Sequence, residues 1–275
     1  MIDTEPWERA VAHVAALATG GPANPAWRVT LHFHPDRLVG GVPILESLAR
    51  DGRYRSQFET GVSNGGLTAH PGGDRWRWES RLFAGAYDDV EATHRPKYGS
   101  LNFRGRKSGG SPRFGSAYLR LARHTMSRTT FAYPDSVFEP TAFGVEARLS
   151  ELVAIAKSDA QDVLDDYIEA QVHGEVDLAR DVEALVLDPS YRGTEIEAAA
   201  RNLGTVEWHD GFRIATEELL RHPDYRGPEF TALGAELAED GQLDPRILGK
   251  ATGQDDQALK RVWHLLARFG NQELS

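Results

Sequence analysis

Residues 167–188 constrain the fold of this chain more than any other stretch. The segment alternates between apolar and polar residues up to a turn at Gly174, and a short apolar run follows at 182–187. On a β-strand, side chains two positions apart point the same way. Glu169 and Gln171 therefore share one face of a predicted strand, with apolar side chains on the other face. That polar face either lines a cleft, where a carboxylate stands beside an amide, or meets water at the edge of a sheet.

Composition narrows the class of protein. The chain has 275 residues, of which 40% are hydrophobic and 26% charged, and these fractions are typical of a folded globular protein. Cysteine is absent, which excludes disulfides, thiolate metal sites and cysteine nucleophiles. No apolar run approaches the roughly 18 residues of a membrane span, and no secretory signal is visible. We therefore expect a cytoplasmic protein with no membrane partner.

Charge is distributed unevenly along the chain, whose formal net charge is -10. From Arg95 to Arg128 there are nine Lys or Arg residues and no Asp or Glu, whereas the segment from Asp135 to Asp188 is strongly acidic. A basic segment in an acidic protein indicates either a local site for phosphates of a nucleotide or nucleic acid, or a solvated face paired with the acidic half. The overall acidity argues against indiscriminate binding to nucleic acid.

The spacing of apolar residues predicts an α+β fold, with a mixed β core, peripheral helices and a helical C-terminal extension. Helices are predicted at 5–18, 44–49, 149–164 and 259–269. Strands are predicted at 28–33, 75–83, 97–103, 117–121, 129–133 and around Glu169, and an apolar run follows at 182–187. The chain divides accordingly into an N-terminal helix at 1–26, a core at 27–190 and a C-terminal extension at 191–275.

Two histidines, His32 and His34, lie on one face at the end of the first predicted strand, and Asp36 follows them. His-x-His at a strand end is a metal-ligand spacing. With Asp36 or Asp135, the pair could serve a metal-dependent hydrolase. A single histidine that donates to a ribose hydroxyl is the rival interpretation, and a histidine that bonds the local backbone is the structural alternative.

Hydroxyl, amide and guanidinium groups gather beside a glycine turn at 54–66, where Arg55, Ser56, Ser63 and Asn64 are candidates for a phosphate site. Backbone N–H groups in such turns can cradle phosphate oxygens. The segment matches neither the Walker pattern nor the dinucleotide fingerprint.

Two further segments carry candidate side chains. Tyr98 could stack on a flat ring while Arg95 meets a phosphate, although ordinary cross-strand packing would also explain the tyrosine. Asp135 and Glu139 lie between prolines, a setting that favours a loop, and they are rival candidates for a catalytic carboxylate. The alternation of charge and aromatic residues at 75–79 indicates a structural strand.

The order of these parts resembles the ADP-ribosyltransferase superfamily: a first strand ending in His, a helix and turn bearing Ser, a strand bearing Tyr, and a late strand bearing Glu. The stretch from Glu169 to the apolar run at 182–187 is similar to the catalytic-glutamate strand and the following strand of DarT-like enzymes. The stretches 32–36, 57–66, 95–102 and 135–140 also resemble a bacterial family of proteins of unknown function. The first resemblance implies an ADP-ribosyltransferase-like core at about 28–188.

Carried over to this sequence, the resemblance implies an NAD-dependent ADP-ribosyltransferase with NAD as its substrate. Glu169 would bond the ribose 2′-hydroxyl and stabilise an oxocarbenium-like state as nicotinamide leaves. His34, or His32, would hold the nicotinamide ribose, and Tyr98 would pack on the nicotinamide ring. Arg55 or Arg95 would face the pyrophosphate. The remaining residues of the implied NAD site are Ser56, Ser63, Asn64, Asn102 and Gln171.

The acceptor of ADP-ribose is left open between a nucleic acid, which the basic segment would suit, and a protein or small molecule, which the overall acidity favours. Two other classes of function remain: the metal-dependent hydrolase built on His32, His34 and Asp36 or Asp135, and a non-catalytic module that binds a nucleotide.

Overall fold

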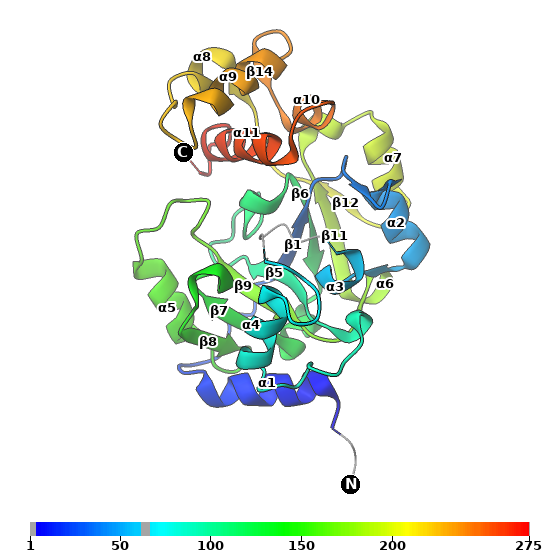
Figure 1. The fold of residues 1–275 in the computed structure, drawn as a ribbon, viewed down its shortest axis with the longest axis vertical. Coiled ribbons are helices and arrows are strands. Elements are labelled where there is room, and N and C mark those ends of the chain that lie inside the picture. The colour runs from blue at the N-terminus through cyan, green and yellow to red at the C-terminus, as the bar shows by residue number, and fades with distance from the viewer. Residues whose placement is uncertain (1–3, 62–66, 275) are drawn as a thin grey trace.

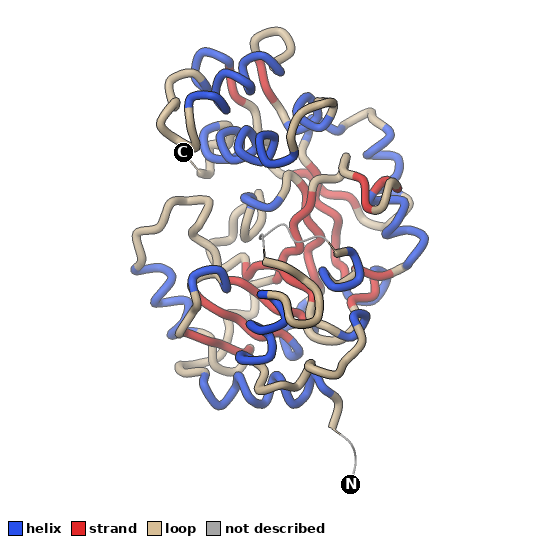
Figure 2. The backbone as a smooth tube through the Cα atoms, in the orientation of Figure 1, coloured by secondary structure: helices blue, strands red, loops and turns tan. Residues whose placement is uncertain are grey.

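The computed structural model describes residues 4–61 and 67–274. In these residues an eight-stranded sheet runs through the centre of an α+β fold, and helices lie around it (Figures 1 and 2). The strands of this sheet are β1 Val29–Phe33, β5 Lys97–Leu101, β6 Ala117–Leu121, β7 Thr129–Tyr133, β8 Ala142–Val145, β9 Ile168–Val172, β11 Val182–Leu187 and β12 Val206–Trp208. Their order is β12-β11-β6-β1-β5-β9-β7-β8. The sheet is mixed, because β11 and β12 run parallel while the other neighbours are antiparallel.

The α-helices are α1 Pro6–Leu17, α2 Ile44–Asp51, α3 Gln57–Thr60, α4 Asp74–Leu82, α5 Ser150–Ser158, α6 Leu178–Asp181, α7 Glu195–Arg201, α8 Thr216–Leu219, α9 Pro228–Leu237, α10 Pro245–Gly249 and α11 Asp256–Phe269. Short 3-10 helices are η1 Ala92–His94, η2 Pro112–Phe114, η3 Arg123–Arg128, η4 Ser136–Phe138 and η5 Pro189–Tyr191. Two-residue strands are β2 Leu38–Val39, β3 Val42–Pro43, β4 Arg53–Tyr54, β10 Val176–Asp177, β13 Ile214–Ala215 and β14 Gln242–Leu243. In the part of the chain that is described, no helix has the length and apolar character needed to cross a membrane.

One face of the central sheet is apolar. Alternation places Leu31 of β1, Leu119 of β6, Phe131 of β7 and Ala170 of β9 on this face, where all four are buried in the main hydrophobic cluster. Helices α2, α5 and α7 add side chains to the same cluster and so cover this face. Because burying a Leu or Phe side chain contributes about 1.5–3 kcal/mol, this face supplies a large part of the stability of the fold.

The opposite face is polar and nevertheless buried. Thr30 of β1 pairs with Ser100 of β5, Ser100 pairs with Glu169 of β9, and Gln171 pairs with Thr130 of β7. All five side chains are at most 5% exposed. The predicted placement of Glu169 and Gln171 on one face, with apolar neighbours on the other, is confirmed. The water-facing alternative for this strand is therefore wrong.

Helices α1 and α4 cover the β7–β8 end of the polar face. Ala10 and Val14 of α1, together with Trp78 and Leu82 of α4, form a second apolar cluster that includes Ala132 of β7. Figure 1 shows α1 at one end of the molecule and α8–α11 at the other. The middle of the polar face, between these two ends, is where the side chains of Glu169 and Gln171 lie.

The sheet splits between β1 and β5. Only two residue pairs join these strands, Val29 with Leu101 and Thr30 with Ser100. Beyond them β1 stays paired with β6 as far as Phe33, and β5 stays paired with β9 along its whole length. Gly99 permits the close approach at the junction, because a Cβ atom there would lie 2.5 Å from both the Thr30 carbonyl oxygen and a Leu31 methyl group.

The C-terminal region has an apolar core of its own. Phe212, Val262, Trp263 and Leu266 are among its buried members, and helices α8–α11 pack around them (Figure 1). The central sheet nevertheless continues past residue 190, because β12 is its edge strand.

Most predicted elements are present with bounds close to those expected. Helices occur at the predicted positions near residues 5–18, 44–49 and 259–269, and strands occur near 28–33, 97–103, 117–121, 129–133, Glu169 and 182–187. The predicted helix at 149–164 ends at Ser158, and Leu164 instead joins the C-terminal apolar core.

The predicted strand at 75–83 is wrong, because this segment is helix α4. Its alternation of charge and aromatic residues also fits helical spacing. Arg75, Trp78, Glu79 and Leu82 stand at positions i, i+3, i+4 and i+7 and are the buried residues of the helix. An interval of three or four marks one face of a helix.

The basic segment pairs with carboxylates. Of its nine cations, eight form ion pairs with Asp or Glu, and the ninth, Lys97, donates to the carbonyl oxygens of Thr93 and Gly174. The eight are Arg95, Arg104, Arg106, Lys107, Arg113, Arg120, Arg123 and Arg128. This pairing favours the second interpretation of the segment, in which its charge serves the fold.

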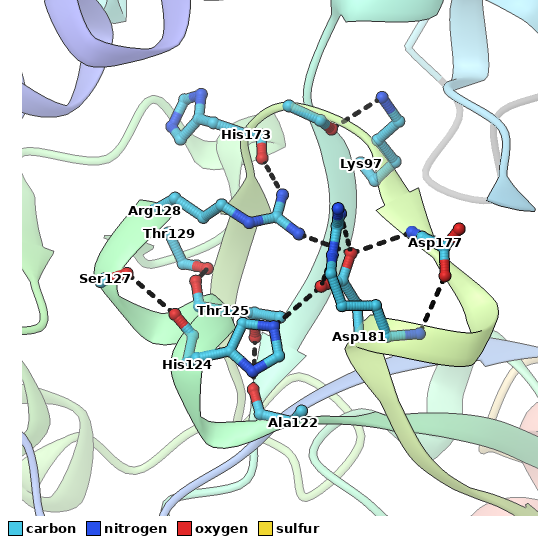
Figure 3. A network of polar contacts seen from close by, with 12 residues as sticks. Lys97, Ala122, His124, Thr125, Ser127, Arg128, Thr129, His173, Asp177 and Asp181 are labelled. Carbon is cyan, nitrogen blue, oxygen red and sulfur yellow. Dashed lines mark hydrogen bonds and ion pairs between the residues drawn. The ribbon is translucent and has the colours of Figure 1, made fainter.

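Asp181 is the centre of the densest of these networks (Figure 3). Its carboxylate is fully buried and accepts hydrogen bonds from His124 and Arg128 at 2.8 Å each, and from Arg180 and the Asp177 backbone N–H at 2.9 Å. Burial acts to raise the pKa of Asp181, but the bonds from Arg180 and His124 outweigh it and hold the pKa well below its ordinary value. The network joins η3, β10 and α6.

We expect Asp181→Asn to lower the free energy of unfolding by about 3 kcal/mol at pH 7, because the mostly buried Arg128 loses its counterion. The folded pKa lies below the unfolded value of about 3.9. The contribution is therefore present above that value and is lost as the pH falls below it. Denaturant titrations at pH 7 and pH 3 measure both effects, with the exposed Asp224→Asn as control. A difference from wild type that is equal at the two pH values would contradict the assignment.

Candidate functional site

A cleft of about 460 Å³ opens where β1 and β5 separate. Its floor is the polar face of the sheet, including Glu169 and Tyr98. One wall comes from α2 and the segment that follows it, and the opposite wall comes from η2 and α11. Small-molecule sites have volumes of roughly 300–1,000 Å³, so a nucleotide-sized ligand could occupy this cleft.

Glu169 lies buried at the floor of the cleft and is held from three sides. Its Oε2 atom accepts a hydrogen bond from Oγ of Ser136 at 2.8 Å, and its Oε1 atom accepts one from Nε2 of Gln171 at 2.9 Å. An Nη1 atom of Arg75 lies 3.8 Å from Oε2. Burial raises the pKa of Glu169 to about 7, with Asp135 adding to the rise and Arg75 opposing it. The carboxylate is thus poised between its two protonation states near neutral pH.

Tyr98 lies beside Glu169, but one face of its ring is already covered. The guanidinium carbon of Arg75 is 4.0 Å from the ring centroid, within the range of a cation–π contact. The Tyr98 hydroxyl donates to Oε1 of Glu79 at 2.8 Å, and Arg95 forms a buried ion pair with the same carboxylate at 2.7 Å. The ring is therefore fixed in orientation by α4.

The two strand histidines have different surroundings. Nδ1 of His32 is 3.2 Å from the Gly115 carbonyl oxygen, and its Nε2 accepts from the Ser111 N–H at 3.2 Å, so the backbone occupies both nitrogens. His34 lies edge-on to Trp263, with ring centroids 4.8 Å apart. No hydrogen bond to its ring nitrogens is found within 4–61 and 67–274. Burial lowers the pKa of both histidines to about 3, so both are neutral at pH 7.

The predicted site residues separate into two groups. Glu169, His32, His34, Tyr98 and Arg55 line the cleft. Arg55 forms an ion pair at 2.6 Å with Asp51, which also lines the cleft.

Other predicted site residues serve the fold around the cleft. The Ser56 hydroxyl caps α3 and donates to the Ala92 carbonyl oxygen. Asn102 bonds the backbone of Arg106, and Arg95 is buried against Glu79. Gln171 touches Glu169 from within the sheet. Ser63 and Asn64 lie outside the described residues.

Several cleft residues were missed by the sequence analysis. Arg75 was placed in a structural strand, although its spacing of four from Glu79 was a readable helical signal. Ser136 gave no signal of its own, because its contact with Glu169 joins positions 33 apart in the chain. Lys260 and Trp263 of α11 line the opposite wall, which only the tertiary fold reveals.

The ligand set of a metal-dependent hydrolase is not assembled. Within the described part of the chain, no group of three or more His, Asp or Glu side chains is arranged to hold a metal ion. Asp36 instead accepts a hydrogen bond from the Tyr191 hydroxyl at 2.8 Å, and Asp135 caps η4 and bonds Tyr167.

The cleft lining is positive although the chain is acidic. Its six cations are Arg37, Arg53, Arg55, Arg75, Arg113 and Lys260. Its four carboxylates are Asp51, Asp135, Glu169 and Asp256, so the lining carries a net charge of +2 when all are ionised, against −10 for the chain. Arg53 and Arg113 are also paired with Glu59 and Asp165, which lie outside the lining, so the preference of the cleft for an anionic ligand is weak.

The family model described as a protein of unknown function (DUF3626) matches residues 28–155 and 144–268. The chain belongs to this family. No curated protein matches it. The match spans both the split sheet and α11, so both walls of the cleft lie within the matched residues.

We expect Glu169→Gln to change the pH dependence of stability. The folded pKa of Glu169, about 7, exceeds the unfolded value of about 4.3, so the folded state holds the extra proton and wild-type stability falls as the pH rises between these values. Glutamine does not titrate. The unfolding free energy of the variant relative to wild type should therefore rise between pH 5 and pH 8, by about 3 kcal/mol at most.

Denaturant titrations at several pH values measure this difference. Glu207→Gln is the control, because Arg120 lowers the pKa of that carboxyl and gives it the opposite sign. A constant difference between Glu169→Gln and wild type would contradict the raised pKa.

Proposed function

We propose that this member of the family is an NAD-dependent ADP-ribosyltransferase, in which Glu169 stabilises positive charge on the ribose of NAD. The observation that carries the proposal is the position of this carboxylate, which is buried on β9 and lines the same cleft as His34 and Tyr98. The strands β1, β5 and β9 are adjacent. Histidine, tyrosine and glutamate, which lie far apart in the sequence, therefore line one cleft, as the proposed ADP-ribosyltransferase-like core requires.

In the proposed reaction the bond between the nicotinamide nitrogen and the anomeric ribose carbon breaks, and nicotinamide leaves with the electron pair. Glu169 in its ionised form stabilises the developing positive charge, as a carboxylate does in glycoside cleavage. The acceptor then forms the new bond to the anomeric carbon and releases a proton. A carboxylate whose pKa is about 7 is suited to take that proton at neutral pH.

The histidine of this mechanism is His34. Both nitrogens of His32 are occupied by the backbone, whereas His34 lines the cleft with neutral ring nitrogens that can bond a ribose hydroxyl. His32 then acts as a support that joins β1 to the loop before β6.

The nicotinamide ring must share Tyr98 with Arg75. The planar guanidinium lies against one face of the tyrosine ring at 4.0 Å. In the proposal the nicotinamide ring packs against Tyr98 beside this guanidinium, whose Nη1 atom keeps its contacts with Glu169 and Ser136.

The pyrophosphate is assigned to the cations that line the cleft. Arg95 is removed from this role because it is buried against Glu79. Arg55 lies on one wall, where it is paired with Asp51, and Lys260 lies on the other. Arg113 also lines the cleft but is paired with Asp165, so in the proposal the diphosphate lies between Arg55 and Lys260.

The proposed acceptor is a protein or a small molecule. Eight of the nine cations in the basic segment are paired with carboxylates, so the segment supplies no excess charge for a phosphate backbone.

We expect wild-type protein to bind NAD by isothermal titration and to release nicotinamide. Glu169→Gln should lower the release rate on the order of 100–1000-fold, because it removes one preorganised electrostatic group. Glu207→Gln, at the far edge of the sheet, should match wild type.

An unchanged rate in Glu169→Gln would remove this residue from the mechanism. If wild type binds NAD without turnover, the protein is a nucleotide-binding module.

We also expect no binding of a labelled single-stranded oligonucleotide, even at low salt, where phosphate contacts are strongest. A fluorescence-anisotropy titration at about 20 mM and 200 mM salt measures it. Binding that weakens steeply with added salt would restore a nucleic-acid acceptor.

A further inference from the structure

A chain of four buried hydrogen bonds leads from Tyr87 to Glu169. The Tyr87 hydroxyl lies 2.7 Å from Nδ1 of His173, and Nε2 of His173 lies 3.0 Å from Oγ1 of Thr130. The Thr130 hydroxyl donates to Oε1 of Gln171 at 2.8 Å, and Nε2 of Gln171 donates to Glu169 at 2.9 Å. All five residues are at most 5% exposed, so bulk water is not available to replace any member.

The direction of every bond follows from the carboxylate. Ionised Glu169 only accepts hydrogen bonds, so Gln171 must turn its NH2 group toward it and its Oε1 toward Thr130. Thr130 has one hydroxyl proton, and it donates this proton to Oε1 of Gln171. The lone pair of Thr130 therefore faces His173, whose Nε2 must carry the proton. Nδ1 of His173 is then an acceptor, and the Tyr87 hydroxyl donates to it.

The orientations of the Tyr87, His173 and Phe83 rings are consistent with these bond directions. The planes of Tyr87 and His173 differ by only 7°, which suits an in-plane bond from the hydroxyl to Nδ1. Phe83 packs edge-on against His173 with centroids 5.0 Å apart. Burial lowers the pKa of His173 to about 3, so the ring is neutral and has one N–H and one acceptor nitrogen at pH 7.

We propose that Thr130 and His173 are positioning residues, which act through Gln171 to keep an N–H donor directed at Glu169. The Thr130 hydroxyl fixes the amide, and the His173–Tyr87 pair fixes the hydroxyl. Without this chain the amide of Gln171 is free to turn its oxygen toward the carboxylate, where like partial charges repel. The inference deepens the proposed function, since it assigns residues that prepare the carboxylate on which that function rests.

Other groups also face Glu169 and share control of its ionisation. Arg75 of α4 and Ser136 of η4 contact it directly, and Asp135 and Tyr98 are close enough to act on its charge. The chain reaches the other carboxylate oxygen, Oε1. A change in the chain can therefore be separated from changes at Arg75 and Ser136.

The first test reads the tautomer of His173 in wild-type protein. Two-bond ¹H–¹⁵N correlation spectra of histidine-labelled protein at pH 8 should show the proton on Nε2. A proton on Nδ1 would reverse the chain and overturn the proposal. This measurement needs no variant and no ligand.

The second test changes Thr130. Thr130→Val keeps the shape but removes the hydroxyl, and Thr130→Ser keeps the hydroxyl. The ¹³C titration of the Glu169 carboxyl should move upward by roughly half a unit to one unit in Thr130→Val, because the ionised form loses a fixed donor. Thr130→Ser should titrate like wild type. Thr129→Val is the matched control, since its hydroxyl bonds only the Thr125 carbonyl among the contacts of the described chain.

An unchanged titration in Thr130→Val, or an equal shift in Thr129→Val, would overturn the proposal. If Thr130→Val does not fold, the tautomer of His173 decides. Both readouts are made without NAD. A wild-type protein with no nicotinamide release would refute the proposed function and leave the positioning chain intact.

Discussion

The separation of β1 from β5 after two residue pairs is the constraint on which the rest of the structure depends. A continuous sheet would bury both edges in hydrogen bonds and leave no cleft. The junction is held tightly, because Gly99 lets the backbones approach where any side chain would clash. Beyond it, β1 follows β6 and β5 follows β9, so a cavity opens with sheet on both sides. His34, which follows β1, and Glu169 of β9 then line one space although these two strands are not neighbours.

The polar face of the sheet is buried, so its hydrogen-bond donors and acceptors must bond one another. These bonds determine the surroundings of Glu169. Buried donors and acceptors that lack partners are costly, and most side chains around Glu169 are joined in chains of hydrogen bonds, although Nε of Arg75 has no partner among the described residues. The same burial that makes these bonds necessary disfavours the ionised carboxylate. Arg75, Ser136 and Gln171 oppose this effect and favour the ionised form, and the pKa of the carboxyl is about 7.

The periodicity of the sequence predicted most strands of the sheet but few of the residues that line the cleft. Alternation located β6 and β7 to the residue and placed Glu169 and Gln171 on one face, because period-two spacing is a property of single strands. Alternation gave a wrong strand at α4, because the charged and aromatic residues there fit both the two-residue period of a strand and the 3.6-residue period of a helix. Ser136, Lys260 and Trp263 were missed because their roles come from contacts between segments that are distant in sequence. The basic segment was ambiguous for the same reason, since its carboxylate partners lie elsewhere in the chain.

Helix α11 forms one wall of the cleft, so its sequence affects which ligands the cleft admits. The Trp263 indole bonds the carbonyl oxygens of Pro112 and Arg113, which ties the helix to the loop that precedes β6, and Asp256 at its N-terminal end pairs with Arg37. These two contacts therefore join α11 to the residues that line the cleft. Substitutions along one side of this helix would retune which molecules are admitted, with the reactive floor untouched. In the proposed enzyme, selectivity and reactivity would therefore be encoded in separate stretches of the gene.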